Sequence, residues 1–476
     1  MNVSIITALV SIVLAGGILL ALNRANIFLL IILICSSFLG FVDPLAFTAK
    51  GLFDIHLIFL ILIFITIITS GSKIKEISNL KLKMPIYVLV TLLCYGILIP
   101  VIREHSSIFY AFKSSKEFMM ILWYFSAFLY IRDEKNIDIA WKYLIAIGIY
   151  YTILESIAQI ASPALSNIIT YGFRKEFFVF WKIYPPFWPF ILILLFVSLY
   201  QVVFKIKNAY LLLFIGAIGL FFTFFRSYFL ASIAVIPLVL VLQGRGSLKY
   251  LQKAIISGIV IITGILTLTL TLGDNKVLTE LTDKFITSGI TEISDQSGGA
   301  LAGRDAYAEG LYLLRDSMPL TGYGFIDKDS SFGLEARKKL IGDLVGFIDK
   351  GTLDVTIKFG YIGGVILYGC FIYIAILLIR ISKEDISSSL KARTLTAASI
   401  TIVYLIVQPV HAPLTNSFAL LPYMLALGLI ERQYFIEKNL NKGKNKTPEN
   451  NISDRIEDSQ KDDMYESVTL KQSNAN

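Results

Sequence analysis

Long apolar runs recur along most of this chain, and they constrain its fold more than any other feature. A helix needs about 20 apolar residues to cross a membrane. Runs of roughly this length fall near 5–22, 27–47, 54–71, 84–102, 117–131, 143–161, 187–204, 209–225, 228–242, 254–272, 353–381, 394–410 and 416–431. Only helices and closed barrels satisfy every backbone polar group in lipid, and barrel strands alternate apolar with polar residues. The unbroken runs therefore predict an all-α polytopic integral membrane protein with about 12–13 transmembrane helices.

The composition excludes the soluble classes of protein. Charged residues make up 16% of the chain, whereas a typical soluble domain has about 25%. The formal net charge is +8, but the basic residues lie mostly in short connections between the runs, so they indicate topology and not nucleic-acid binding. Cys35, Cys94 and Cys370 lie inside apolar runs without a CxxC spacing, so neither a disulfide framework nor a metal site is predicted.

Lysine and arginine in the short loops predict which loops are cytoplasmic. They gather in 73–83, 132–142, 205–207, 245–253 and 383–393, which alternate correctly with the runs. The chain then divides into an N-terminal transmembrane bundle (1–272), a large external loop with short helices (273–352), C-terminal transmembrane helices (353–431) and a tail (432–476). The polar tail cannot bury a core and is predicted to be disordered in the cytoplasm. We expect the functional residues to lie in the long external loop, because structureless loops of this length are rare unless they are functional.

A few charged residues at the predicted outer face are the candidate functional groups. Arg226 lies between two apolar runs with almost no loop, where it either binds an anion or snorkels to lipid headgroups. Arg304 and Arg315 lie eleven residues apart on an amphipathic helix predicted to end at Pro319, a spacing that places both on one face. Pro319-Leu-Thr-Gly-Tyr-Gly324 follows as a tight turn, with glycines that permit close backbone approach.

Three further charged residues lie where the run 353–381 begins. Asp349 and Asp354 lie near its outer boundary, and Lys358 lies one turn deeper. Charges within a membrane are functional candidates; the alternative is an Asp354–Lys358 pair at i, i+4 spacing that neutralises the lysine structurally. The chain has no P-loop, HExxH or GxSxG motif, and its first external loop has no DxD-like acidic pair. The sequence therefore predicts no metal and no cofactor.

The order of these segments resembles that of the O-antigen ligase and Wzy-type polysaccharide polymerase superfamily. Its three blocks are Ser/Thr-x-Ser-Arg, an arginine followed by Pro-Leu-x-Gly-x-Gly, and His-Asn-x-x-Leu-(x)6-Gly-x-x-Gly. Here they read as Thr223-Phe-Phe-Arg226, Arg304 with Pro319-Leu-Thr-Gly-Tyr-Gly324, and Asp349-Lys-Gly-Thr-Leu353 with Gly360 and Gly363. The resemblance covers about residues 205–430. Phe225 stands where the family has serine, and Asp349-Lys350 stands where its ligases have histidine-asparagine.

The resemblance implies a GT-C-like helical fold in the bacterial cytoplasmic (inner) membrane. It implies a metal-independent glycosyltransferase that polymerises undecaprenyl-diphosphate-linked oligosaccharide repeat units into O-antigen or capsular polysaccharide. Arg226, Arg304 and Arg315 would bind the diphosphate, because the planar guanidinium binds phosphate bidentately. Asp349 or Asp354 would orient or activate the acceptor hydroxyl. The implied partners are the lipid-linked oligosaccharide, membrane lipid and a chain-length regulator, with no nucleic acid.

Two other functions remain open alternatives. A ligase would share the fold and the donor but transfer polymer to lipid A core or to a protein; the ligases' histidine is absent from the third block, which favours a polymerase. A flippase or transporter is the second alternative. Transporters tend to show internal repeats and broken helices at mid-membrane, and the two halves of this sequence show no convincing repeat.

Overall fold

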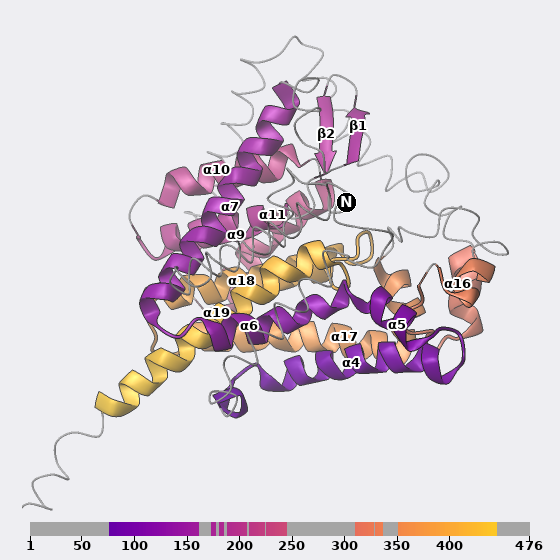
Figure 1. The fold of residues 1–476 in the computed structure, drawn as a ribbon. Coiled ribbons are helices and arrows are strands. Elements are labelled where there is room, and N and C mark those ends of the chain that lie inside the picture. The colour runs from indigo at the N-terminus through magenta and orange to yellow at the C-terminus, as the bar shows by residue number, and fades with distance from the viewer. Residues whose placement is uncertain are drawn as a thin grey trace, which may run out of the picture.

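The computed structural model describes residues 76–160, 173–177, 180–184, 188–206, 209–223, 225–244, 310–327, 329–336 and 351–444. Most of them are helical (Figure 1). Four helices are long and apolar enough to cross a membrane: α4 (Lys83–Ile102), residues Glu134–Ser156 of α7 (Glu134–Ile160), α17 (Gly351–Lys383) and α18 (Ser388–Val407). The described part of the chain is thus mostly helical and contains helices able to cross a membrane, as its apolar runs predicted.

Most of the other described helices coincide with expected segments. They are η4 (Phe118–Leu122), α6 (Trp123–Tyr130), α9 (Phe190–Val203), α10 (Ala209–Phe222), α11 (Arg226–Leu242), a helix over 310–317, α16 (Ser331–Ala336) and α19 (Ser417–Lys444). A further helix, α5 (Ile108–Ser115), forms in the connection between the predicted runs 84–102 and 117–131, where the sequence predicted none. Several of these helices are shorter than a full membrane span; α9 and α10, for example, have 14 residues each. The predicted runs 5–22, 27–47, 54–71 and 254–272 lie outside the described residues.

A β-hairpin corrects the expectation that every element is helical. Strands β1 (Phe173–Phe177) and β2 (Phe180–Tyr184) pair antiparallel, with Phe173 opposite Tyr184 and Phe177 opposite Phe180. The hairpin lies between the predicted runs 143–161 and 187–204, where the sequence predicted no element. Aromatic residues at both ends of each strand favour extended, paired backbone, and this short signal is easily missed beside runs of membrane length.

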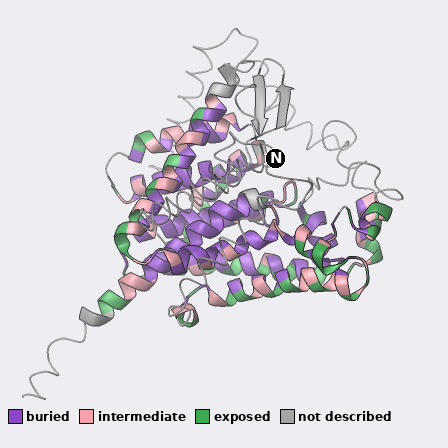
Figure 2. Ribbon diagram, in the orientation of Figure 1, coloured by how far each residue is buried: buried purple, intermediate pink, exposed green. Residues whose placement is uncertain are grey.

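Side chains are most completely buried in the middle of the bundle. Figure 2 shows buried residues concentrated in α6, α18 and α19. The large side chains of Trp123, Tyr124 and Tyr423 are fully buried there. In contrast, α4 and α17 lie side by side and expose apolar side chains such as Leu98 and Val365 (Figures 1 and 2). An apolar exposed face of this kind suits contact with lipid.

Several predicted cytoplasmic segments meet at one end of the bundle, which we call the basic end. It contains residues 76–83, 131–138, 382–393 and 431–438. The Arg393 guanidinium lies 2.6 Å from an Asp138 carboxylate oxygen, and the backbone N–H of Lys81 donates to Glu431 over 2.6 Å. These contacts join α4, α7, α18 and α19, so loops that the lysine pattern assigned to one side lie together.

The helix α19 continues further than the sequence predicted. Residues 432–444, assigned above to a disordered tail, are helical. Contacts at the basic end explain the extension: Gln433 accepts a hydrogen bond from Arg393 over 2.7 Å, and Tyr434 and Lys438 both bind Glu384, over 2.8 and 2.7 Å. Polar residues that cannot fill a core are here ordered by ion pairs with neighbouring loops. Residues 445–476 lie outside the described part of the chain.

Candidate functional site

The helix α17 is broken at Gly360, near the end of the bundle opposite the basic end. Gly360 has φ 66° and ψ −178°, so two helical segments meet there at a kink. This backbone conformation is almost restricted to glycine. A break inside a predicted membrane span leaves N–H and C=O groups without helical partners, and such groups need partners from elsewhere.

A turn of the external loop supplies those partners. We call residues 318–325 the glycine turn. Four backbone hydrogen bonds join it to α17 on both sides of the break, with N···O distances between 2.7 and 3.3 Å. They are Tyr323 N to Ile357 O, Gly324 N to Lys358 O, Tyr361 N to Pro319 O and Ile362 N to Leu320 O. The second and third blocks of the sequence are therefore in direct contact.

Glycine is required on both sides of this contact. Gly322 has φ 64°, and a Cβ added to it would lie 2.5 Å from the backbone nitrogen of Gly360. A Cβ on Gly360 would overlap the carbonyl oxygen of Leu320. The predicted close backbone approach at the turn glycines is confirmed, and its partner is the broken helix.

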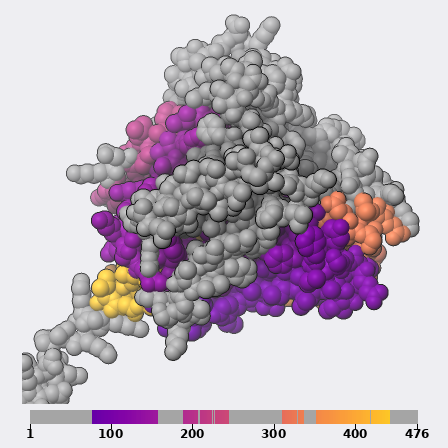
Figure 3. Space-filling model, viewed as in Figure 1, coloured from indigo at the N-terminus to yellow at the C-terminus, as the bar shows by residue number. Residues whose placement is uncertain are grey.

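Side chains from α4 hold the glycine turn in place. Arg103, directly after α4, donates to the Gly322 carbonyl over 3.1 Å and to the Thr321 hydroxyl over 2.8 Å. The Tyr95 hydroxyl donates to the Thr321 carbonyl over 2.7 Å. Figure 3 shows the 310–336 segment lying against the α4–α5 region. Arg103 was not among the candidate residues predicted from the sequence, although its place at the outer end of a predicted run was an available signal.

The helix over 310–317 packs against the glycine turn and the first part of α17. Leu311 and Leu314, which the sequence placed on membrane or bundle, are buried in a cluster with Tyr323, Leu353 and Ile357. The helix ends before Pro319, as predicted. Residues 303–309 of the predicted helix lie outside the described part.

Arg315 lies beside the second half of α17. Its Nε donates to Asp316 over 2.6 Å, and its guanidinium carbon lies 4.9 Å from the centre of the Tyr312 ring and 6.0 Å from that of Tyr361. The side chain keeps 24% of its surface exposed. It is therefore a surface cation close to the break, held by one carboxylate and two aromatic rings.

Asp354 lies in the first turn of α17 and has two partners. Its Oδ2 lies 2.8 Å from Lys358 Nζ and accepts a hydrogen bond from the Thr415 hydroxyl over 2.5 Å. The carboxylate is largely buried. The i, i+4 pair considered from the sequence is present, and the Thr415 contact adds a link to another part of the chain.

Thr415 belongs to the connection between α18 and α19, residues 408–416, which we call the α18–α19 turn. In the same turn, His411 Nε2 lies 2.9 Å from Ser227 Oγ. The turn packs directly on the start of α17, since a Cβ added to Gly351 would lie 2.6 Å from Gln408 Nε2 and overlap the His411 carbonyl. One turn therefore contacts both Ser227, next to the first block, and Asp354, within the third.

Aromatic rings surround the imidazole of His411. The ring centroid of Phe225 lies 5.5 Å away in an edge-on arrangement, and that of Tyr228 lies 5.3 Å away. Trp188 stacks on Phe225 at 4.9 Å. Phe225, the departure from the family's serine, thus forms one wall around the histidine. His411 was not among the residues selected from the sequence, because its partner Ser227 is 184 positions away.

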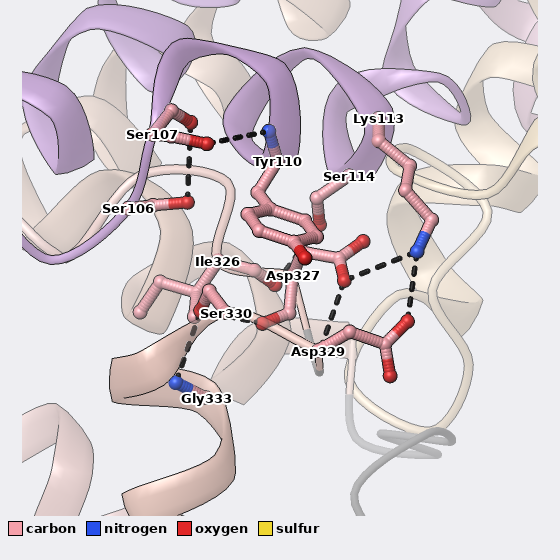
Figure 4. Close-up of polar contacts among 10 residues, drawn as sticks. All are labelled: Ser106, Ser107, Tyr110, Lys113, Ser114, Ile326, Asp327, Asp329, Ser330 and Gly333. Carbon is pink, nitrogen blue, oxygen red and sulfur yellow. Dashed lines mark hydrogen bonds and ion pairs between the residues drawn. The ribbon is translucent and has the colours of Figure 1, made fainter.

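A second polar network, shown in Figure 4, fixes α5 to the segment after the glycine turn. Lys113 Nζ lies 3.3 Å from Asp327 and 2.8 Å from Asp329, and Ser114 donates to the Ile326 carbonyl over 2.9 Å. Burial alone would lower the pKa of Lys113, but the hydrogen bonds and charges of the two aspartates outweigh it and raise that pKa. This network anchors the loop, and its ion pairs are mutually satisfied.

His105 lies between the glycine turn and α16. Its ring centroid is 5.4 Å from that of Tyr323 and 4.5 Å from that of Phe332. Burial, followed by the charge of Arg103, lowers the pKa of His105. Its Nε2 is buried and has no hydrogen-bond partner within the described ranges. His105 is therefore a packing residue.

The structure describes two of the five site residues selected from the sequence. Arg315 lies beside Tyr361, directly after the break in α17, whereas Asp354 lies in the first turn of that helix and binds Thr415 of the α18–α19 turn. Asp349 and Arg304 lie outside the described residues. Arg226 begins α11, and its side chain is likewise outside the described part. Within the described ranges no group of three or more His, Cys, Asp or Glu side chains could hold a metal ion.

Comparisons with families of known proteins and with curated proteins found no relative of this chain. No protein-family model matches the chain, and no curated protein matches it significantly.

Proposed function

We propose that this protein polymerises undecaprenyl-diphosphate-linked oligosaccharide repeat units into O-antigen or capsular polysaccharide at the outer face of a bacterial cytoplasmic membrane. The fold we propose is GT-C-like with about 12–13 transmembrane helices. The observation that carries the proposal is the contact between the glycine turn and the broken helix α17. Because four hydrogen bonds join these segments, the motifs of the second and third blocks act as one structural unit beside the Asp354–Lys358 pair.

The chemistry requires cations for the donor and a proton acceptor for the sugar hydroxyl. A lipid diphosphate is a good leaving group once its developing charge is stabilised. In the proposal, Arg226, Arg304 and Arg315 bind the diphosphate, because guanidinium groups bind phosphate oxygens bidentately without a metal. Arg315 suits this task because its side chain is partly exposed beside the glycine turn.

Asp349 and Asp354 are the carboxylates proposed to act on the acceptor. Asp354 already accepts from Lys358 and Thr415 through one oxygen, so we assign it the orienting role. The contacts of Asp354 keep the start of α17 and the α18–α19 turn in register. Asp349 is the second carboxylate proposed to act on the acceptor.

The test is polymerisation by the purified protein in lipid nanodiscs. Lipid-linked repeat units from cells lacking the gene are the substrate, and electrophoresis resolves the product by length. A ladder of lipid-linked polymers is expected. Products of unchanged repeat length would refute the proposal and favour a transporter, and transfer of preformed polymer to lipid A core would favour a ligase.

Arginine variants test the proposed diphosphate contacts. Arg315→Gln should lower kcat/KM by about 10–100-fold, the equivalent of one charge-assisted hydrogen bond. Arg380→Gln is the matched control, because Arg380 is an exposed arginine near the far end of α17, toward the basic end. Equal activities of the two variants would count against the role of Arg315.

A further inference from the structure

The pair formed by Ser227 and His411 has a geometry suited to proton transfer. The Oγ···Nε2 distance of 2.9 Å is that of a hydrogen bond. Both side chains are half-buried, so neither is sealed from a substrate. In the tautomer with its proton on Nδ1, the His411 ring accepts the Ser227 hydroxyl proton at Nε2.

The surroundings fix the imidazole in one orientation. Phe225 and Tyr228 lie against its ring, at centroid distances of 5.5 and 5.3 Å. The backbone of the α18–α19 turn is held by its own hydrogen bonds, including His411 N to Val407 O at 2.8 Å. Thr415 fastens the other end of the turn to Asp354. A base held by packing and neighbouring hydrogen bonds is what efficient proton transfer requires.

His411 differs in this respect from His105, the other histidine in the described part of the chain. His105 Nε2 is buried between aromatic rings and lacks a hydrogen-bond partner there. His411 Nε2 instead faces a half-exposed hydroxyl. Imidazole is the side chain whose ordinary pKa, about 6.5, suits a general base near neutral pH.

We propose that Ser227 and His411 form a proton relay that activates the acceptor sugar hydroxyl in the glycosyl transfer. The inference rests on the proposed function and assigns the proton acceptor of its reaction to His411, which leaves Asp349 and Asp354 with the role of orienting the acceptor. The acceptor O–H proton passes to Ser227 Oγ while the Ser227 proton passes to His411 Nε2. The acceptor oxygen forms a bond to the anomeric carbon, the bond from that carbon to the phosphate oxygen breaks, and the electron pair stays on the departing diphosphate.

Among the residues that the structure describes, the charged and titratable groups packed around the relay come from three elements. Tyr228 lies on α11 beside Ser227, and Tyr404 lies on α18 with its ring centroid 6.4 Å from that of Tyr228. The Asp354–Lys358 pair on α17 contacts the same turn through Thr415. Because that pair carries one charge of each sign, it places no net charge beside the turn. A base that must be unprotonated to accept the proton gives the rate an acid limb.

The pH dependence of polymerisation tests the relay. Wild-type protein in nanodiscs, with lipid-linked repeat units as substrate, should lose activity about tenfold per pH unit below the acid limb. His411→Gln keeps a hydrogen-bonding side chain and should lower the rate by about 100-fold or more and abolish that limb. Ser227→Ala, which leaves the turn intact, should lower the rate to a similar extent. His105→Gln is the control and should retain the acid limb.

The outcomes separate the relay from the proposed function. Absence of polymer from the wild-type protein at every pH would refute the proposed function and the relay with it. Polymerisation by wild type together with unchanged rates and an unchanged acid limb in His411→Gln would refute the relay alone. If His411→Gln does not fold, Ser227→Ala decides, because an unaltered rate in that variant is incompatible with transfer through the hydroxyl.

Discussion

Substitution of Gly360 by alanine probes the junction between the glycine turn and α17. At φ 66° and ψ −178°, a residue with a Cβ is strained by about 1–3 kcal/mol. The new Cβ would also overlap the Leu320 carbonyl, so the turn must move away. Four hydrogen bonds join the two segments, and each contributes about 0.5–1.5 kcal/mol net. The lower ends of these ranges together give about 3 kcal/mol against the docked turn.

Hydrogen–deuterium exchange measures this cost directly. The amides of Tyr323, Gly324, Tyr361 and Ile362 donate across the junction. A loss of about 3 kcal/mol should speed their exchange by roughly 100-fold in Gly360→Ala. Peptides covering 318–325 and 359–363, followed by mass spectrometry on protein in nanodiscs, report the change.

Gly369→Ala is the matched control on the same helix. Gly369 is exposed, and a Cβ there would meet no atom within 4 Å. Alanine is the better helix former by up to about 1 kcal/mol, so exchange at the junction should stay as in wild type. Equal exchange rates at the junction in Gly360→Ala and Gly369→Ala would refute the view that the glycine turn is docked by this backbone pairing.

Three further perturbations follow from the described contacts. Thr415→Val removes the hydrogen bond to Asp354 and should lower polymerisation by about 10-fold, with an unchanged melting temperature as the check that the fold is intact. Burial, followed by the charge of Arg103, lowers the pKa of His105 from 6.5. The contribution of His105 to stability is therefore full above about pH 6.5 and is lost as the pH falls through the lowered pKa. Exchange in 106–115 should accordingly quicken on acidification, after correction for intrinsic rates, and His105→Gln should remove that dependence. Glu76→Gln leaves the buried Arg432 guanidinium without its carboxylate and should destabilise the protein by roughly 2–4 kcal/mol, whereas Lys438→Gln, at a half-exposed pair, should cost less than about 1 kcal/mol in thermal unfolding.

The helices were predictable from the sequence because membrane-length apolar runs are a local property. The run 84–102 became α4 (Lys83–Ile102), and 353–381 became most of α17. The Asp354–Lys358 pair was also predictable, since i, i+4 spacing on a helix brings side chains together without help from the rest of the fold. The turn glycines were visible for the same reason, because positive φ is a local requirement.

Contacts between distant segments were not predictable from one sequence. Nothing near Arg103 indicates that its guanidinium binds Gly322, 219 positions later. The pairing of His411 with Ser227 likewise depends on how α18 and α19 pack against α11. The extension of α19 was also not predictable, because its polar composition indicates a disordered tail. Tyr434 and Lys438 are ordered there by contacts with Glu384 on another loop. In each case the deciding interaction is long-range.

Partners for both its backbone and its side chain explain how Lys358 is tolerated inside a predicted span, next to the break in α17. At Lys358 the backbone carbonyl bonds Gly324, while the ammonium group bonds Asp354, which also binds Thr415. The backbone groups exposed by the break are thus satisfied by the glycine turn, and the carboxylate that pairs with Lys358 is held by the α18–α19 turn. Because one residue connects both, a displacement of either turn must disturb the hydrogen bonds of the other. Gly360→Ala should therefore alter not only exchange in the glycine turn but also the reactivity of the Ser227–His411 pair, although neither residue contacts Gly360.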